Sequence, residues 1–111
     1  MRPRTMARQF EVFENPIAAA RQIYPLIAVL QSDVADTGRT QMVAPMAVEA
    51  AMRLKPAGRL TPIVRIANDA YVVWVHDMVA MRSSDLKRSK GDIGAARDAI
   101  KAALDYLFHG I

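Results

Sequence analysis

Turn-forming residues divide most of this chain into short apolar runs, and that spacing limits the fold more than any other feature. Before residue 92, prolines, glycines and clusters of Asn or Asp interrupt the sequence so often that each apolar run has the length of a strand. Asn68-Asp69 separates two runs rich in β-branched residues and is expected to form a tight hairpin turn. Strands are therefore predicted over residues 9–13, 23–30, 41–46, 63–67 and 71–75.

The prolines and two further segments add detail to this pattern. Pro25 suggests a bulge or an edge position in the second run, and Pro45 is expected to end the third. Residues 47–54 are ambiguous, although their Ala, Glu, Met and Leu content favours one or two helical turns. Residues 78–89 are expected to form a loop.

The last segment has the periodicity of a helix. Apolar residues recur there at three- and four-residue steps from Ile93 to Phe108, which predicts one apolar helical face. Asp92 is expected to cap this helix or to lie in its first turn, and Gly110 allows it to stop. Short strands followed by one helix predict a mostly β or α+β fold, a small β-barrel or folded sheet with a helix packed on it.

Composition narrows the class of protein. A length of 111 residues argues for one domain, and a hydrophobic content of 52% excludes a disordered protein. No apolar run approaches the roughly 20 residues that cross a membrane. The absence of cysteine removes disulfides, thiolate metal sites and thiol catalysis, and it suits a reducing compartment. Because the basic N-terminus also lacks the apolar core of a secretory signal, we expect a cytoplasmic protein.

The net charge of +4 is unevenly distributed. Arg2, Arg4 and Arg8 account for three of the excess charges, which leaves 12 basic against 11 acidic residues in the body. We expect residues 1–8 to be a disordered basic extension of a single domain over 9–111, with Met6 as an alternative start. A nearly neutral body argues against direct binding of nucleic acid.

One basic cluster remains in the body, at Arg82, Lys87, Arg88 and Lys90, and it has two interpretations. Asp85 interrupts it and Asp92 follows it, as is typical of a solvated loop. The alternative is a contact for an anion or a protein partner.

No motif for catalysis or for a cofactor emerges. His76 and His109 have no second ligand at a metal-binding spacing, and no serine lies in a nucleophile elbow. The string Gly91-Asp92-Ile93-Gly94 fits an RNA-binding loop but is more simply the entry to the helix. We therefore expect no catalytic residue, no metal site and no cofactor, and we look for function in binding.

The chain end is unusual because it is apolar. Leu107-Phe108-His109-Gly110-Ile111 places large side chains at the tip of the predicted helix, where termini are ordinarily polar and frayed. Such a tip is either packed into the core or presented to a partner. Phe108 lies on the apolar stripe and is expected in the core, while His109 and Ile111 fall outside it and are better placed for display.

Three stretches of the sequence together resemble one protein family. They are the opening Gln9-Phe10-Glu11-Val12, the segment from Leu30 to Thr37 that reads LQSDVADT before Met42-Val43-Ala44-Pro45, and the terminal helix that ends in FHGI. In order and spacing they resemble the CcdB family of plasmid and chromosomal toxins. The resemblance covers nearly the whole chain from Gln9.

This resemblance implies a fold and an activity. The fold is a small SH3-like barrel with a C-terminal helix that forms a homodimer. Members of the family are not enzymes; they insert into the dimer interface of the gyrase A subunit and trap gyrase on cleaved DNA. A cognate CcdA-like antitoxin neutralises them through a disordered tail, and the pair binds operator DNA through the antitoxin and autoregulates.

The resemblance also implies a site. By position, the residues that would contact gyrase are Asp105, Phe108, His109, Gly110 and Ile111 in the helix and Val34 and Ala35 in the loop. An acidic antitoxin tail suits the basic cluster at Arg82, Lys87, Arg88 and Lys90.

Three positions differ from the family pattern. His109 replaces a Trp, Asp105 replaces an Asn, and Val34 with Ala35 replaces two isoleucines. The shorter loop pair alone would lose about 3 kcal/mol of contact if all of it were buried. One alternative is therefore a CcdB-like dimeric module that binds antitoxin without poisoning gyrase, and another is an endoribonuclease toxin of the MazF kind.

Overall fold

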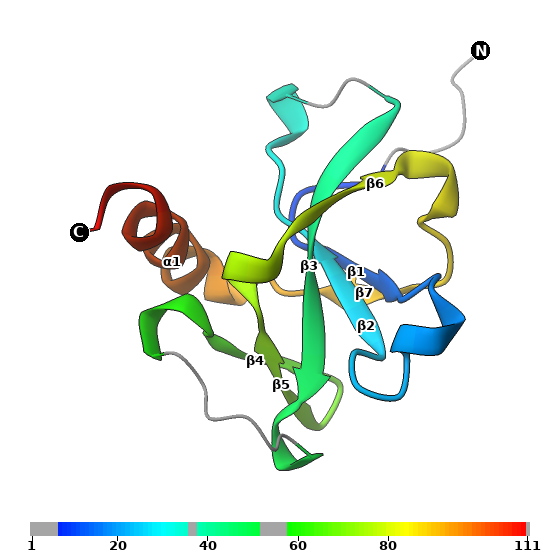
Figure 1. Cartoon of the computed structure of the whole chain (residues 1–111), viewed down its shortest axis with the longest axis horizontal. Helices are drawn as coiled ribbons and strands as arrows, with labels where there is room; N and C mark the ends of the chain where they lie inside the picture. Colours follow the sequence, from blue (N-terminus) through cyan, green and yellow to red (C-terminus); the bar gives the residue numbers. More distant parts are fainter. Residues whose placement is uncertain (1–6, 36–37, 52–57, 111) are drawn as a thin grey trace.

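A computed structural model describes residues 7–35, 38–51 and 58–110 of the chain. These residues form a mostly β fold with one C-terminal helix, as the sequence predicted (Figure 1). The strands are β1 (Glu11–Glu14), β2 (Leu26–Val29), β3 (Thr40–Val48), β4 (Ile63–Ile66), β5 (Asp69–Val73), β6 (Val79–Arg82) and β7 (Ser89–Asp92). The helix α1 spans Arg97–His109. Short 3₁₀ turns join them: η1 (Ala18–Ala20), η2 (Asp33–Ala35), η3 (Glu49–Ala51), η4 (Gly58–Leu60), η5 (Val75–Asp77), η6 (Ser83–Asp85) and η7 (Gly94–Ala96).

The strands of the described residues form a single antiparallel sheet in the order β4-β5-β3-β2-β1-β7, with β6 paired to the first half of β3. The sheet curls into a half-barrel, so its two ends approach each other. Ile66 of β4 lies 3.8 Å from the position that a Cβ on Gly91 of β7 would occupy. This arrangement is consistent with a small barrel followed by a helix.

Both faces of the sheet are buried at β2, which explains why the run at Leu26–Val29 is continuously apolar. Ala28 lies in the main core, where Ile100 and Ala103 of α1 pack on the concave face. Its neighbour Ile27 faces the other way, into a second cluster covered in part by Leu86. Because successive side chains of a strand point to opposite faces, a strand with two covered faces loses the alternation of polar and apolar residues.

The hairpin of β4 and β5 is confirmed, but its turn lies one residue earlier than predicted. Ile66 pairs with Asp69, so the two central residues are Ala67 and Asn68. Ala67 has a positive φ of 54°, while Asn68 does not. A positive φ at the first central residue alone is the pattern of a type II′ turn, a common connection between twisted strands.

Pro45 does not end β3, contrary to the prediction from sequence. The strand continues through it to Val48 because Pro45 lies where the neighbour of β3 changes from β6 to β5. A proline has no N–H to donate, and this junction requires none. Its carbonyl oxygen accepts a hydrogen bond of 2.9 Å from the Trp74 N–H.

The prediction of a loop over residues 78–89 was wrong. That segment holds β6, the turn η6 and the start of β7. The residues of β7 are all exposed, and in β6 only Met81 is partly buried, against the second cluster. Neither strand therefore shows an alternation of buried apolar residues, and both are held mainly by backbone pairing, β7 to β1 and β6 to β3.

The N-terminal extension predicted over residues 1–8 lies mainly outside the described residues. Ala7 and Arg8 are described, and both are tied to the domain. Ala7 packs on the second apolar cluster, and its carbonyl oxygen accepts a hydrogen bond from Gln41 Nε2. The Arg8 N–H donates to the Glu11 carboxylate.

Candidate functional site

The C-terminal helix begins five residues later than Asp92, which was the predicted cap. Asp92 ends β7, and its Oδ1 accepts a hydrogen bond of 2.9 Å from the Gly94 N–H, which shapes the entry to η7 and α1. The acid in the first turn of α1 is Asp98. At the other end Gly110 takes the left-handed conformation with φ of 73°, and its N–H donates to the Tyr106 carbonyl, as predicted for a stop signal.

The last turn of α1 gathers the predicted gyrase-contact residues on one exposed face. Helix residues follow one another at about 100°, so Asp105, Phe108 and His109 lie within roughly a quarter to a third of the circumference, opposite the buried stripe. All three are exposed, as is Gly110. Ile111 lies outside the described residues.

Phe108 is 63% exposed, so the expectation that it belongs to the core was wrong. It lies on one shoulder of the apolar stripe and beyond Ala103, the last fully buried residue of the helix. Nothing in the described part of the sheet reaches far enough to cover it. The tip of the helix is therefore a presented apolar surface.

The motif Gln31-Ser32-Asp33 builds a second exposed feature, the turn η2. Ser32 Oγ accepts a hydrogen bond of 3.1 Å from the Val34 N–H, and Gln31 Nε2 donates to the Ala35 carbonyl at 2.8 Å. Asp33 Oδ1 accepts from the Gln9 N–H at 2.8 Å. The polar side chains of this motif are thus hydrogen-bonded to the backbone, and the side chain of Val34 points into solvent, 97% exposed.

The structure does not bring these two features together within one chain. Asp33, at the start of η2, lines a surface cavity of about 500 Å³ that also includes Gly94 and Arg97, before and at the start of α1. The tip of the helix lies elsewhere, and Figure 1 shows η2 and the last turn of α1 well apart. Val34 and Ala35 thus form one surface, and the helix tip forms another.

The predicted basic cluster is divided by the fold. Arg82 Nε lies 3.3 Å from Asp85 Oδ2, so an acid within the cluster neutralises it. Arg88 Nη1 lies 3.5 Å from Glu14 Oε1 across the β1–β7 pair. The β1–β7 register passes from Gly91 to Ser89, which leaves Lys90 as the extra residue of a bulge. The four side chains therefore do not act as one patch.

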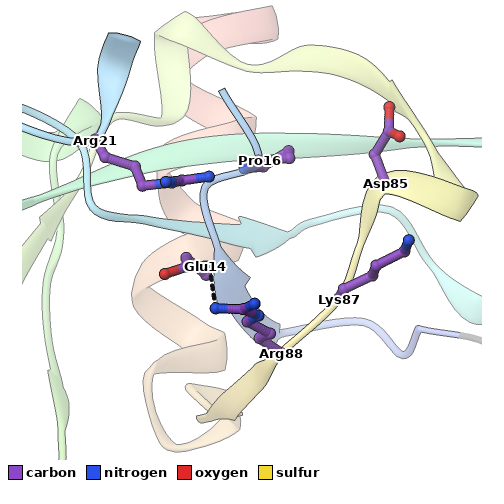
Figure 2. A pocket seen from close by; sticks show the side chains of 6 residues that line it. All are labelled: Glu14, Pro16, Arg21, Asp85, Lys87 and Arg88. Atoms are coloured by element: carbon purple, nitrogen blue, oxygen red, sulfur yellow. Dashed lines mark ion pairs between the residues drawn. The ribbon is translucent and has the colours of Figure 1, made fainter. Parts of the chain in front are cut away.

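Sequence reasoning missed two basic residues that the fold brings to these surfaces. Arg21 follows η1 and lines a second surface cavity, which Lys87 and Arg88 line from its other side (Figure 2). Arg59 in η4 places its guanidinium carbon 5.1 Å from the centre of the Tyr106 ring, close to the helix tip. The sequence separates each from its partner by more than forty residues, and no local pattern signals such a contact.

Two kinds of feature are absent from the described residues: a metal-binding cluster and a membrane-spanning helix. These residues hold no group of three or more His, Cys, Asp or Glu side chains that could bind a metal ion. None of their helices is long and apolar enough to cross a membrane.

A comparison with known families gives the context of these surfaces. The model of a family described as CcdB protein matches residues 9–110. The match begins just before β1 and runs through the C-cap of α1, so it includes the sheet, η2 and the helix tip. The chain belongs to the CcdB family of toxins of toxin–antitoxin modules.

Proposed function

We propose that this protein binds the A subunit of DNA gyrase through the last turn of α1 and traps gyrase on cleaved DNA. The observation that carries this proposal is the exposure of Phe108, 63%, beside Asp105 and His109 on one face. This activity is the one that the resemblance to the CcdB family implies. The contact requires no chemistry from the toxin, so the protein acts as a binder and not as an enzyme.

The composition of the helix tip suits a protein interface. Burial of a Phe side chain contributes about 1.5–3 kcal/mol, and aromatic residues at the centre of an interface dominate its binding energy. The His109 imidazole presents less area than the Trp of the family pattern, but it can stack on a guanidinium of the target. We expect a weaker contact than that pattern would give, centred on Phe108.

Two separate contact surfaces on one chain favour a symmetric dimer as the active form. A two-fold axis presents each surface twice, so a single target can contact the helix tip of one copy and Val34 with Ala35 of the other. Sedimentation equilibrium is expected to give twice the mass of the chain. A monomer at micromolar concentration would contradict this part of the proposal.

The remaining parts of the proposed function concern regulation. A cognate antitoxin neutralises the toxin, and its acidic tail contacts basic side chains of the predicted cluster other than Arg82, whose charge is offset by Asp85. Operator DNA is bound only through the antitoxin, because the body of the toxin is nearly neutral. The toxin acts in the cytoplasm, where gyrase and its DNA are found.

The deciding experiment mixes the purified protein with gyrase, ATP and supercoiled plasmid. Linear DNA released by protease after denaturation reports trapped cleavage complexes. We expect the native chain to produce it and a variant that lacks His109, Gly110 and Ile111 to lose it. Lys101→Ala, an exposed change two turns from the tip, is the control and should leave the product unchanged.

Expression without antitoxin separates the alternatives. Growth arrest with gyrase linked to cleaved DNA supports the proposal. Arrest with cut messenger RNA and unaffected gyrase would instead support an endoribonuclease of the MazF kind. Absence of arrest, with antitoxin still bound, would support a binding module that does not poison gyrase.

A further inference from the structure

A cavity of about 320 Å³ opens among segments that lie on the side of the molecule away from α1 (Figure 1), and Figure 2 shows the side chains that line it. It is bounded by the end of β1, the turn after η1 and the segment before β7. These segments meet because β1 and β7 are antiparallel neighbours, and the Glu14 N–H donates to the Arg88 carbonyl at 3.3 Å. Its lining residues are Glu14, Pro16, Arg21, Asp85, Lys87 and Arg88.

The cavity is lined by more basic than acidic side chains, and one of the basic side chains has no partner among the described residues. Arg88 is paired with Glu14, and Asp85 is already paired with Arg82 outside the cavity. Lys87 has no ion pair or hydrogen bond with the described residues, and Figure 2 shows its side chain extending into the cavity. Its ammonium group is available for a ligand.

Arg21 is held in place by one of its nitrogens while the others stay open. Its Nε donates a hydrogen bond of 2.6 Å to the Asn15 carbonyl, and Figure 2 shows the guanidinium reaching across the cavity toward Pro16. The backbone of Arg88 is in the left-handed region, with φ of 61°, which directs its side chain to Glu14 beneath the same cavity. The three cations thus line the cavity from different sides: in Figure 2 Arg21 reaches in beside Pro16, Arg88 turns to Glu14, and Lys87 extends on the other side, away from Arg21.

The balance of charges favours the carboxylates of a peptide over a nucleic-acid backbone. A row of phosphates would pass Glu14 and Asp85 and be repelled, while separate carboxylates of a flexible acidic segment can reach Lys87 and Arg21 one at a time. The volume suits one or two side chains, and the ring of Pro16 supplies an apolar wall for their methylene groups.

We propose that this cavity binds an acidic segment of the antitoxin through the carboxylates of its Glu or Asp side chains, with Lys87 and Arg21 as the primary contacts on its two sides. The inference rests on the proposed function, since it locates the antitoxin contact assigned there to a broader basic cluster. Arg82 and Lys90 are excluded because neither of them lines the cavity. Arg88 is a secondary contact. Its ion pair with Glu14 is exposed and 3.5 Å long, so its guanidinium can also approach a bound carboxylate.

The test measures binding of an acetylated and amidated octaglutamate peptide to the full chain by amide chemical shifts. We expect shifts confined to residues 14–21 and 85–90, with octaglutamine giving none. Affinity should fall about three- to fivefold in Lys87→Gln and less than twofold in Arg82→Gln, its matched control. It should also fall as salt rises from 0.1 to 1 M, because screening shortens the Debye length from about 10 to about 3 Å.

Several results would overturn the inference. One is an equal loss of affinity in Lys87→Gln and Arg82→Gln, and another is a set of shifts centred on the helix tip. Stronger binding of a 16-base-pair DNA duplex to the same amides would make the cavity a phosphate site instead.

Gyrase cleavage by the same variants tests the proposed function separately from the carboxylate site. A protein that binds octaglutamate but does not poison gyrase would contradict the proposed function and leave the carboxylate site standing.

Discussion

Phe10 and Phe108 carry the same side chain in opposite environments. Phe10 is 3% exposed, and its ring lies 5.4 Å below the guanidinium carbon of Arg97, which joins the start of α1 to the sheet. Phe108 is mostly exposed and contacts no covering element at the helix tip. The sequence predicts both rings in the core, because apolar patterning reports a face of an element and not where the neighbouring element ends. The exposed fraction of each ring shows that Phe10 belongs to the core and Phe108 to the surface.

At the residue scale, Phe108→Ala is predicted to separate stability from activity. We expect the free energy of unfolding in urea to fall by less than about 1 kcal/mol, because most of the ring is already in water. Gyrase cleavage should require at least tenfold more protein, because an aromatic anchor is removed.

The control for that variant is Ile100→Ala, a change at a residue that is 0% exposed. It should lower the free energy of unfolding by about 2–5 kcal/mol through the cavity that it leaves. A comparable loss of stability in Phe108→Ala would show that the ring is packed in solution, and the assignment of the tip as a binding surface would then fail.

A second residue-scale prediction concerns the hairpin turn. Ala67 holds a positive φ of 54°, a conformation that glycine adopts without a Cβ clash. Ala67→Gly is therefore expected to raise the free energy of unfolding by about 0.5–1 kcal/mol, measured as a higher urea midpoint. Asn68→Gly is the matched control, since Asn68 has no positive φ and glycine there should be neutral or destabilising.

At the element scale, the sequence predicts best the elements whose side chains are buried. The hairpin of β4 and β5 and the helix α1 follow from β-branched runs and from an apolar stripe. The strands β6 and β7 cannot be found in this way because their side chains face water and their partners are distant in sequence. The two halves of β3, each with a different neighbour on one edge, explain why Pro45 misled the prediction.

The turn η2 gives an element-scale prediction. Gln31 fixes it from both sides, since its Nε2 donates to the Ala35 carbonyl and its Oε1 accepts from the Met42 N–H at 3.1 Å. Gln31→Ala is expected to lower the free energy of unfolding by about 1–2 kcal/mol and to speed hydrogen exchange at the Met42 amide.

The control for this variant is Gln22→Ala, an exposed change for which we expect a difference below about 0.5 kcal/mol. Unchanged exchange at Met42 in Gln31→Ala would show that η2 is held by its backbone alone. The position of Val34 would then not depend on this glutamine.

At the scale of the whole molecule, the charge that suggests nucleic acid in the sequence is redistributed by the fold. Three of the four excess positive charges lie within the first eight residues, and much of the rest is paired, as in Arg82 with Asp85 and Arg88 with Glu14. What remains is a local excess around Arg21 and Lys87, 66 residues apart in sequence. Only the pairing of β1 with β7 brings them to one cavity.

The opposite placement of that cavity and the helix tip predicts that toxicity and antitoxin binding can be separated by mutation. Deletion of His109, Gly110 and Ile111 should abolish growth arrest while leaving capture of co-expressed antitoxin intact, because the end of α1 is remote from the segment before β7 that carries Lys87 (Figure 1). Lys87→Glu should show the reverse: arrest persists, and more antitoxin is needed to relieve it, since a reversed charge repels an acidic tail. Dose–response curves from two independently induced promoters measure both effects in the same cells. If the tip deletion lost antitoxin as completely as toxicity, the two partners would share one surface, and the assignment of separate sites to the two sides of the sheet would be wrong.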